Sequence, residues 1–235
     1  MNRLRNQISE ILEQVSLQAG QVELMVQFGI DALENKSVDR ISEIRKLEVA
    51  VNKREIEIET ECLRALALYH PVANDLQILS TILKANGDLE RIADLALNLA
   101  ERAEALRFSN ATIPPELAEM TRYALEMVQD ADRALAGKDA TMAHDVCKRD
   151  DHLDAMNREL IRLIAELMED DGKQVKAQLH IFSASRIIER IGDHATNIAE
   201  DVVFLVEGDI QRHQYKFPGR IDPAFFSSAP LKNME

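Results

Sequence analysis

Residues 90–101 read ERIADLALNLAE, and residues 189–200 read ERIGDHATNIAE. Eight of the twelve positions are identical, which indicates that the chain contains two copies of one structural unit. The copies lie about 100 residues apart, a spacing that suits a domain and is too long for a solenoid repeat. A second match upstream pairs Glu48, Asn52 and Glu55 with Asp150, Asp154 and Asn157.

The composition points to helices throughout. Only 4% of the residues are aromatic, there is no Trp, and there are just 8 Gly and 6 Pro. A β-sandwich or barrel needs more turn residues and more β-forming side chains than this. Breaks at turn-forming residues predict six helices, at 4–34, 38–69, 72–108, 115–136, 140–169 and 174–207.

Several residues at the breaks predict how the helices begin and end. Ser37 is expected to cap the second helix, and Pro115 suits the first turn of the fourth. Gly137 and Gly208 suit the left-handed position that follows a helix.

The predicted fold is therefore all-α, with six long helices forming two tandem antiparallel three-helix bundles and an irregular C-terminal tail. The first repeat spans residues 1–109 and the second spans 115–208, while residues 209–235 form a tail that we expect to be flexible. Helices of about 30 residues are ~45 Å long, which favours elongated bundles.

The charge balance excludes several classes of partner. The chain has 28 Lys and Arg against 41 Asp and Glu, a net charge of -13, so nucleic acid and anionic lipid would be repelled. The longest run without a charged residue, Ala65–Asn74, is far shorter than the ~18 apolar residues of a membrane span. Cys62 and Cys147 stand alone and are expected to be reduced thiols in a cytoplasmic protein.

Acidic and amide side chains form rows along the predicted helices. At about 100° per residue, Asp193, Asn197 and Glu200 lie within about 80° of Glu189, while the apolar residues occupy the opposite face. Equivalent rows are Glu90, Asp94, Asn98 and Glu101 on the third helix, Glu48, Asn52, Glu55 and Glu59 on the second, and Asp150 and Asp154 with Asn157 beside them on the fifth.

These rows are candidate metal ligands. Carboxylates four residues apart on a helix repel each other, and the rows stack like charges without evident local relief. Oxygen-rich sites suit Mg, Ca, Mn and Fe, with Zn also possible. The alternative is that the rows are simply the solvated faces of amphipathic helices.

Other chemistry has little support in the sequence. A ferritin-like di-iron centre needs Glu-x-x-His, and no His here has a Glu three residues before it. No phosphate-binding loop or nucleophile motif occurs, so we do not expect an enzyme. His194 follows Asp193 but lies ~140° around the helix from Glu189, which favours a supporting or packing role.

The doubled ERIADLALNLAE and ERIGDHATNIAE segments, with the PVANDL stretch at residues 71–76 and the duplicated second-helix rows, resemble the PhoU family. The resemblance covers residues 1–208 and implies paired three-helix bundles, with multinuclear iron or zinc clusters on the acidic faces in some members. It also implies a cytoplasmic negative regulator that links an ABC phosphate transporter to the sensor histidine kinase of the phosphate regulon.

Carried over by position, the acidic motif of that family falls on Glu90 with Asp94 and on Glu189 with Asp193. The first copy has Leu95 where His often follows the Asp, so the resemblance does not imply equal metal occupancy of the two halves. The second-helix partners are Glu48, Asn52, Asp150 and Asp154.

Three functions remain open at the level of sequence. The first is a metal-binding signalling adaptor in phosphate transport, which we expect to form a homodimer or higher oligomer through helix faces other than the rows. The second is a helical scaffold without metal. The third is a carboxylate-bridged metalloenzyme with an open coordination position.

Overall fold

The computed structural model describes residues 2–170 and 172–208, and within these ranges it contains six long α-helices, one short 3₁₀ helix and no strand. The all-α prediction is confirmed, and each helix lies within three residues of its expected bounds. The predicted tail at 209–235 lies outside the described residues. The elements are α1 (Asn2–Asn35), α2 (Ile41–Tyr69), α3 (Asn74–Leu106), α4 (Pro115–Gly137), α5 (Ala140–Asp170), η1 (Gly172–Gln174) and α6 (Val175–Glu207).

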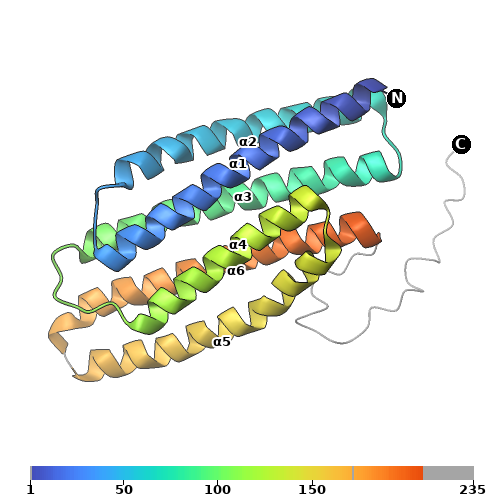
Figure 1. Cartoon of the computed structure of the whole chain (residues 1–235). Helices are drawn as coiled ribbons and strands as arrows, with labels where there is room; N and C mark the ends of the chain where they lie inside the picture. The colour runs from blue at the N-terminus through green and yellow to red at the C-terminus, as the bar shows by residue number, and fades with distance from the viewer. Residues whose placement is uncertain (1, 171, 209–235) are drawn as a thin grey trace, which may run out of the picture.

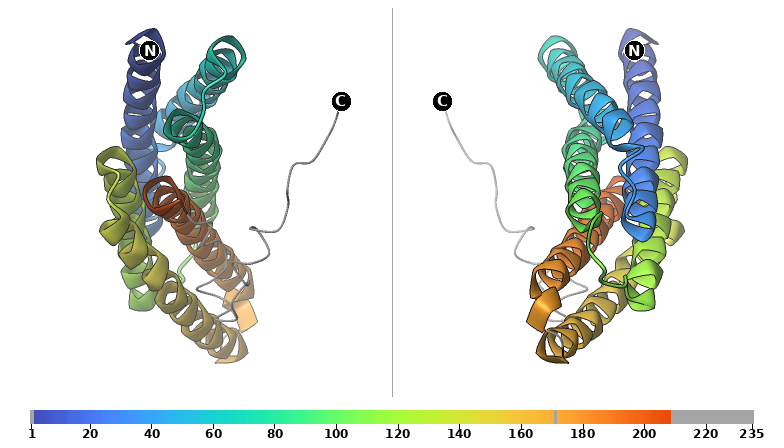
Figure 2. Two further views of the ribbon diagram at one scale, coloured as in Figure 1. Left: turned by 90° about the vertical axis from the view of Figure 1, so that its right-hand side faces the viewer. Right: turned by 90° about the vertical axis from the view of Figure 1, so that its left-hand side faces the viewer.

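The helices form two antiparallel bundles that lie side by side (Figure 1). The first bundle consists of α1, α2 and α3, and the second of α4, α5 and α6. Two contacts join the bundles: α3 packs along α6 extensively, and α1 packs against α4 over a shorter stretch. Helices α2 and α5, one in each bundle, lie on the outside, as the end-on views in Figure 2 show.

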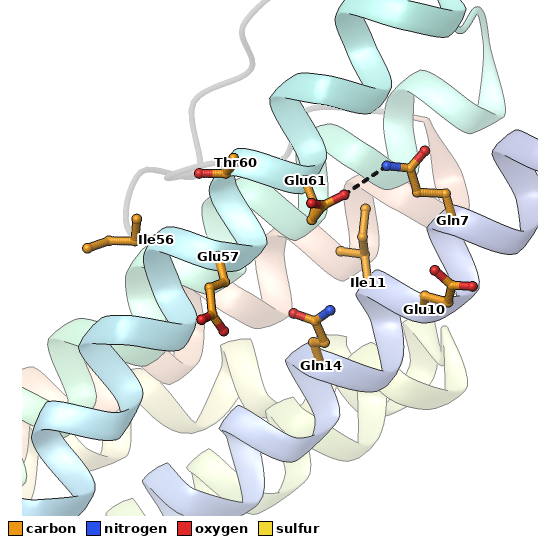
Figure 3. A pocket seen from close by; sticks show the side chains of 8 residues that line it. All are labelled: Gln7, Glu10, Ile11, Gln14, Ile56, Glu57, Thr60 and Glu61. Atoms are coloured by element: carbon orange, nitrogen blue, oxygen red, sulfur yellow. Dashed lines mark hydrogen bonds between the residues drawn. The ribbon is translucent and has the colours of Figure 1, made fainter.

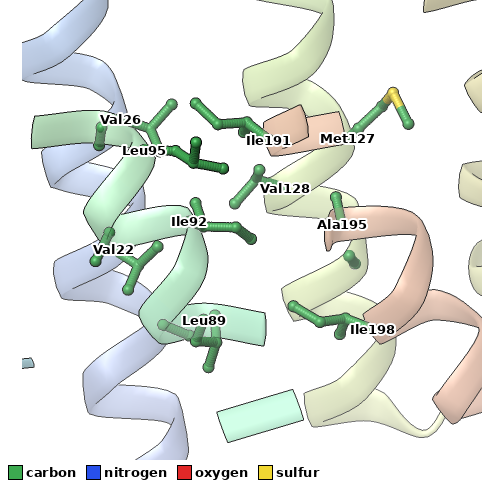
Figure 4. Close-up of a cluster of buried hydrophobic side chains, with 14 of the residues drawn as sticks. Val22, Val26, Leu89, Ile92, Leu95, Met127, Val128, Ile191, Ala195 and Ile198 are labelled. Carbon is green, nitrogen blue, oxygen red and sulfur yellow. The ribbon is translucent and has the colours of Figure 1, made fainter. Parts of the chain in front are cut away.

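One apolar core runs through both bundles. In Figure 4, Val22 of α1 and Ile92 of α3 lie on one side of this core, and Val128 of α4 and Ile198 of α6 lie on the other. Small residues bring the central helices together: a Cβ added to Gly29 of α1 would lie 3.0 Å from the carbonyl oxygen of Ala96. The two repeats therefore share one interior rather than forming two separate cores.

Two of the predicted helix ends are confirmed. Pro115 occupies the first turn of α4, where its missing N–H costs no helical hydrogen bond. Gly208 follows α6 with φ at 80°, in the left-handed region that glycine adopts freely.

The other two predicted ends are wrong. Ser37 does not cap α2, which begins only at Ile41; its Oγ instead accepts the backbone N–H of Asp39 at 3.2 Å within the preceding turn. Gly137 is the last residue of α4, and Lys138 takes the left-handed position after it, with φ at 50°. The equivalent residue after α1 is also a lysine, Lys36, with φ at 48°.

Lys36 shows why a lysine can occupy this position. Its Nζ donates to the carbonyl oxygens of Ser109, at 3.1 Å, and of Ala111, both in the connection between the two repeats. The charge-assisted hydrogen bonds hold the connection against the α1–α2 turn and offset the cost of a left-handed backbone.

Candidate functional site

The acid rows of the first repeat face each other between α2 and α3. Burial raises the pKa of Glu90, and repulsion from Asp94 on the same helix raises it further. Glu55 and Glu48 of α2 add to this increase, while Arg91 opposes it. Four carboxylates from two helices therefore lie close enough to interact. Because Glu90 is partly removed from water, its ionised form is disfavoured.

An amide side chain lies within the same group. Asn52 donates from Nδ2 to Oε1 of Glu48 at 2.5 Å, and its own Oδ1 is buried without a hydrogen-bond donor. A buried oxygen without a donor is costly, and a cation is one species that could satisfy it.

The second repeat has the corresponding arrangement between α5 and α6. Burial is the largest cause of the raised pKa of Glu189, followed by repulsion from Asp193; Asp154 of α5 contributes from across the helix pair. Asp150, only 4% exposed, accepts a hydrogen bond from Oγ1 of Thr196 at 3.3 Å. The buried Asn157 also leaves its Oδ1 without a donor.

The rows do have local charge relief, which sequence reasoning missed. Arg91 places its Nε 3.5 Å from Glu90 and its Nη1 3.8 Å from Asp94. On α6, Arg186 donates to Oε1 of Glu189 at 2.8 Å. The arginines lie one or three residues from the acids along each helix, so the expectation of unrelieved like charges is wrong.

The remaining candidate ligands are Asn98, Glu101, Asn197 and Glu200, and their surroundings differ from one another. Asn98 is exposed, and Glu101 lies 4.0 Å from Nη2 of Arg102. Asn197 points to the other repeat, where its Nδ2 donates to Oδ1 of Asp88 at 3.2 Å. Glu200 is 8% exposed and lies near Cys147, whose pKa it helps to raise.

The chemistry of the donors suits a cation that prefers oxygen ligands. Each group combines carboxylates from two helices with an amide oxygen that lacks a donor. Within residues 2–170 and 172–208, however, no three His, Cys, Asp or Glu side chains are placed so that they could hold one metal ion. The rows thus supply suitable donors without a preformed cage.

A polar contact joins the two repeats beside the second row. His194 of α6 lies with Nδ1 2.7 Å from Oδ1 of Asp88 on α3. Nearby, Lys84 of α3 pairs with Asp201 of α6 at 3.1 Å. Sequence comparison of the repeats could not reveal Asp88, because the equivalent residue of the second repeat is Ile187.

The hollow between α1 and α2 carries acidic and amide groups (Figure 3). Gln7 donates from Nε2 to Oε2 of Glu61 at 3.0 Å, and Glu10 and Glu57 lie along the same groove. Its lining combines the carboxylates of Glu10, Glu57 and Glu61 with two amides and the hydroxyl of Thr60.

The two cysteines are buried and carry free thiols. Burial raises the pKa of Cys62 and of Cys147 to about 12, so neither is a reactive thiolate.

Among the helices of the described ranges, none is both long enough and apolar enough to cross a membrane.

Comparison with known proteins gives consistent matches. A family model described as PhoU domain matches residues 15–103 and 117–202. The chain is 33% identical over 190 residues to the phosphate-specific transport system accessory protein PhoU homolog of Deinococcus radiodurans, which covers 80% of this chain and 89% of that protein. The homolog of the same name from Aquifex aeolicus is 34% identical over 218 residues, covering 91% and 97%.

A solved structure extends the match to three dimensions. The crystal structure of PhoU from Pseudomonas aeruginosa aligns with a TM-score of 0.85 at 32% sequence identity, covering 87% of this chain and 99% of that one. The two segments matched by the family model begin in α1 and α4 and contain every residue of the acid rows.

Proposed function

The chain belongs to the PhoU family, and from this membership we propose that it is a cytoplasmic negative regulator of phosphate uptake and of the phosphate regulon. The observation that carries the proposal is the family match, which includes both copies of the acidic helix pairs. Relatives named as accessory proteins of phosphate-specific transport support it.

The proposed mode of action is that of an adaptor between an ABC phosphate transporter and a sensor histidine kinase. Six long helices offer broad rigid faces for protein contacts. A regulator without catalysis acts by binding one state of its partner more tightly than another. We further propose that the chain forms a homodimer through helix faces other than the rows, to be checked by sedimentation.

The rows are the proposed metal-binding element of this regulator. Glu48, Asn52, Glu90 and Asp94 would hold the metal in the first repeat, and Asp150, Asp154, Glu189 and Asp193 in the second. A bound iron, zinc or manganese ion would supply positive charge between helices whose carboxylates repel each other. Asn98, Glu101, Asn197 and Glu200 would lie at the margins of these sites.

A helical scaffold without metal is the second candidate, because the described residues contain no preassembled group of three ligands. Elemental analysis of purified protein distinguishes the two. If the rows bind metal, Glu189→Gln with Asp193→Asn lowers the metal content, whereas the exposed pair Asp151→Asn with Glu159→Gln leaves it unchanged. Should the row variant melt slightly higher with the same metal content, the scaffold function is favoured.

The regulatory assignment is tested in a strain that lacks the chain. In medium rich in phosphate, we expect phosphatase of the phosphate regulon to be expressed without repression. Normal repression and normal phosphate uptake in the deletion strain would overturn the assignment.

A further inference from the structure

A buried carboxyl group lies at the contact between α1 and α4, away from the acid rows. Asp132 of α4 is 8% exposed, and both of its carboxyl oxygens are buried without a hydrogen-bond donor. Glu23 of α1, half-buried, faces it from the other repeat. Burial raises the pKa of Asp132 well above its usual range, and repulsion from Glu23 raises it further.

The surrounding charges do not neutralise this pair. On α4, Arg133 is engaged by Oδ1 of Asp130 at 2.6 Å. On α5, Arg149 is paired with Oδ2 of the same aspartate. Lys138 and Glu13 line the hollow between α1 and α4, but Glu23 is the only one of the described charges that shifts the pKa of Asp132.

Toward α6, α4 presents apolar residues: Met127 and Val128 lie beside Ile191 and Ala195 of α6 in Figure 4. No charged group of α6 within the described residues is among the causes of the raised pKa of Asp132. Two ionised carboxylates side by side, one of them desolvated, would repel each other strongly. A single proton shared between them gives one carboxyl a donor and removes that repulsion.

The contact between α1 and α4 is the weaker of the two that join the repeats. It is hollow, and Gly20 of α1 lines the hollow with no atom within 4 Å of the position of a Cβ. The contact between α3 and α6 is more extensive and includes the ion pair of Lys84 with Asp201 at 3.1 Å. Separation of α1 from α4 would therefore leave the two repeats joined along α3 and α6.

We propose that Glu23 and Asp132 form a proton-held contact that closes α1 against α4 when it carries one proton and loosens when that proton is lost. The contact makes the angle between the repeats depend on pH. It does not require metal on the rows and goes beyond the proposed regulatory function.

The raised pKa of Asp132 determines at which pH the contact is closed. An acid whose pKa is raised in the folded protein contributes its full stabilisation below its unfolded pKa of about 4. That stabilisation is lost as the pH rises through the folded value. The contact should therefore be closed in acid and loosen toward alkaline pH.

Distances between spin labels test the proposal directly. Cysteines replacing Ser9 and Ala136, exposed residues on the two sides of the hollow, report the contact of α1 with α4. Labels at the exposed Leu76 and Val206 report the contact of α3 with α6, and the two native cysteines are buried.

From about pH 5 to about pH 9, we expect the distance across α1 and α4 to lengthen by roughly 5 Å, half an interhelical spacing, while the other distance stays constant. Asp132→Asn supplies an N–H donor to Glu23 without a proton, so its distance should stay short at every pH. If that variant fails to fold, Glu23→Gln provides the same donor from the other side. A constant distance in the unsubstituted pair, or the same lengthening in the amide variants, would overturn the proposal.

Discussion

Gly192 lies where α6 comes close to both α4 and α5. A Cβ added there would lie 2.1 Å from Cδ2 of Leu153 and 3.8 Å from Cε of Met127. Leu153 is 1% exposed and Met127 is fully buried, so neither can move into solvent. The residue that differs between the two repeats at this point, Ala93 against Gly192, is thus explained by packing.

We expect Gly192→Ala to lower the free energy of unfolding by about 1–3 kcal/mol, because Leu153 must leave its rotamer within a packed core. Gly87→Ala is the matched control: nothing lies within 4 Å of its Cβ position, and the higher helix propensity of alanine should stabilise α3 by up to about 1 kcal/mol. Urea unfolding measures both. Equal effects of the two variants would contradict the packing explanation.

At the scale of the element, helix bounds could be predicted because apolar periodicity and turn residues act locally. The helix caps were less predictable. Lys138 takes the left-handed conformation that was expected of Gly137, and Lys36 takes the same conformation after α1. The hydrogen bonds of Lys36 to the inter-repeat connection depend on tertiary structure. No local pattern encodes that contact.

The junction between α2 and α3 holds a strained backbone. Ala73, just before α3, has φ at 49° and ψ at -123°, a combination that L-residues rarely adopt. We expect Ala73→Gly to raise the free energy of unfolding by about 1 kcal/mol, because glycine adopts this conformation without steric cost. Ala155→Gly, at an exposed position within α5, should lower it by about 1 kcal/mol in the same thermal unfolding measurement. A loss of stability in both variants would show that the junction is not strained.

At the scale of the whole molecule, the turn residues predicted six helices and the internal repeat predicted two copies of one unit, but neither predicted how one repeat contacts the other. The pairs Asp88 with His194 and Lys84 with Asp201 arise from the antiparallel packing of α3 along α6. Asp88 and Lys84 have Ile187 and Ser183 at the equivalent positions of the second repeat. A comparison of the two copies therefore cannot identify these contacts.

The acid rows connect the fold to the proposed regulation. Their carboxylates are held in facing helix pairs at a cost in desolvation and, to a smaller extent, in repulsion, as the raised pKa values of Glu90 and Glu189 indicate. A stable bundle does not require this arrangement, so we attribute it to function.

The most direct measurement is the phosphatase activity of a deletion strain that expresses the Glu189→Gln, Asp193→Asn variant in medium rich in phosphate. The unsubstituted chain and the Asp151→Asn, Glu159→Gln control should both restore repression, and circular dichroism should show that the row variant is folded. We predict that the folded row variant leaves phosphatase expressed at the level of the deletion strain. Full repression by that variant would contradict a regulatory role of the acid rows.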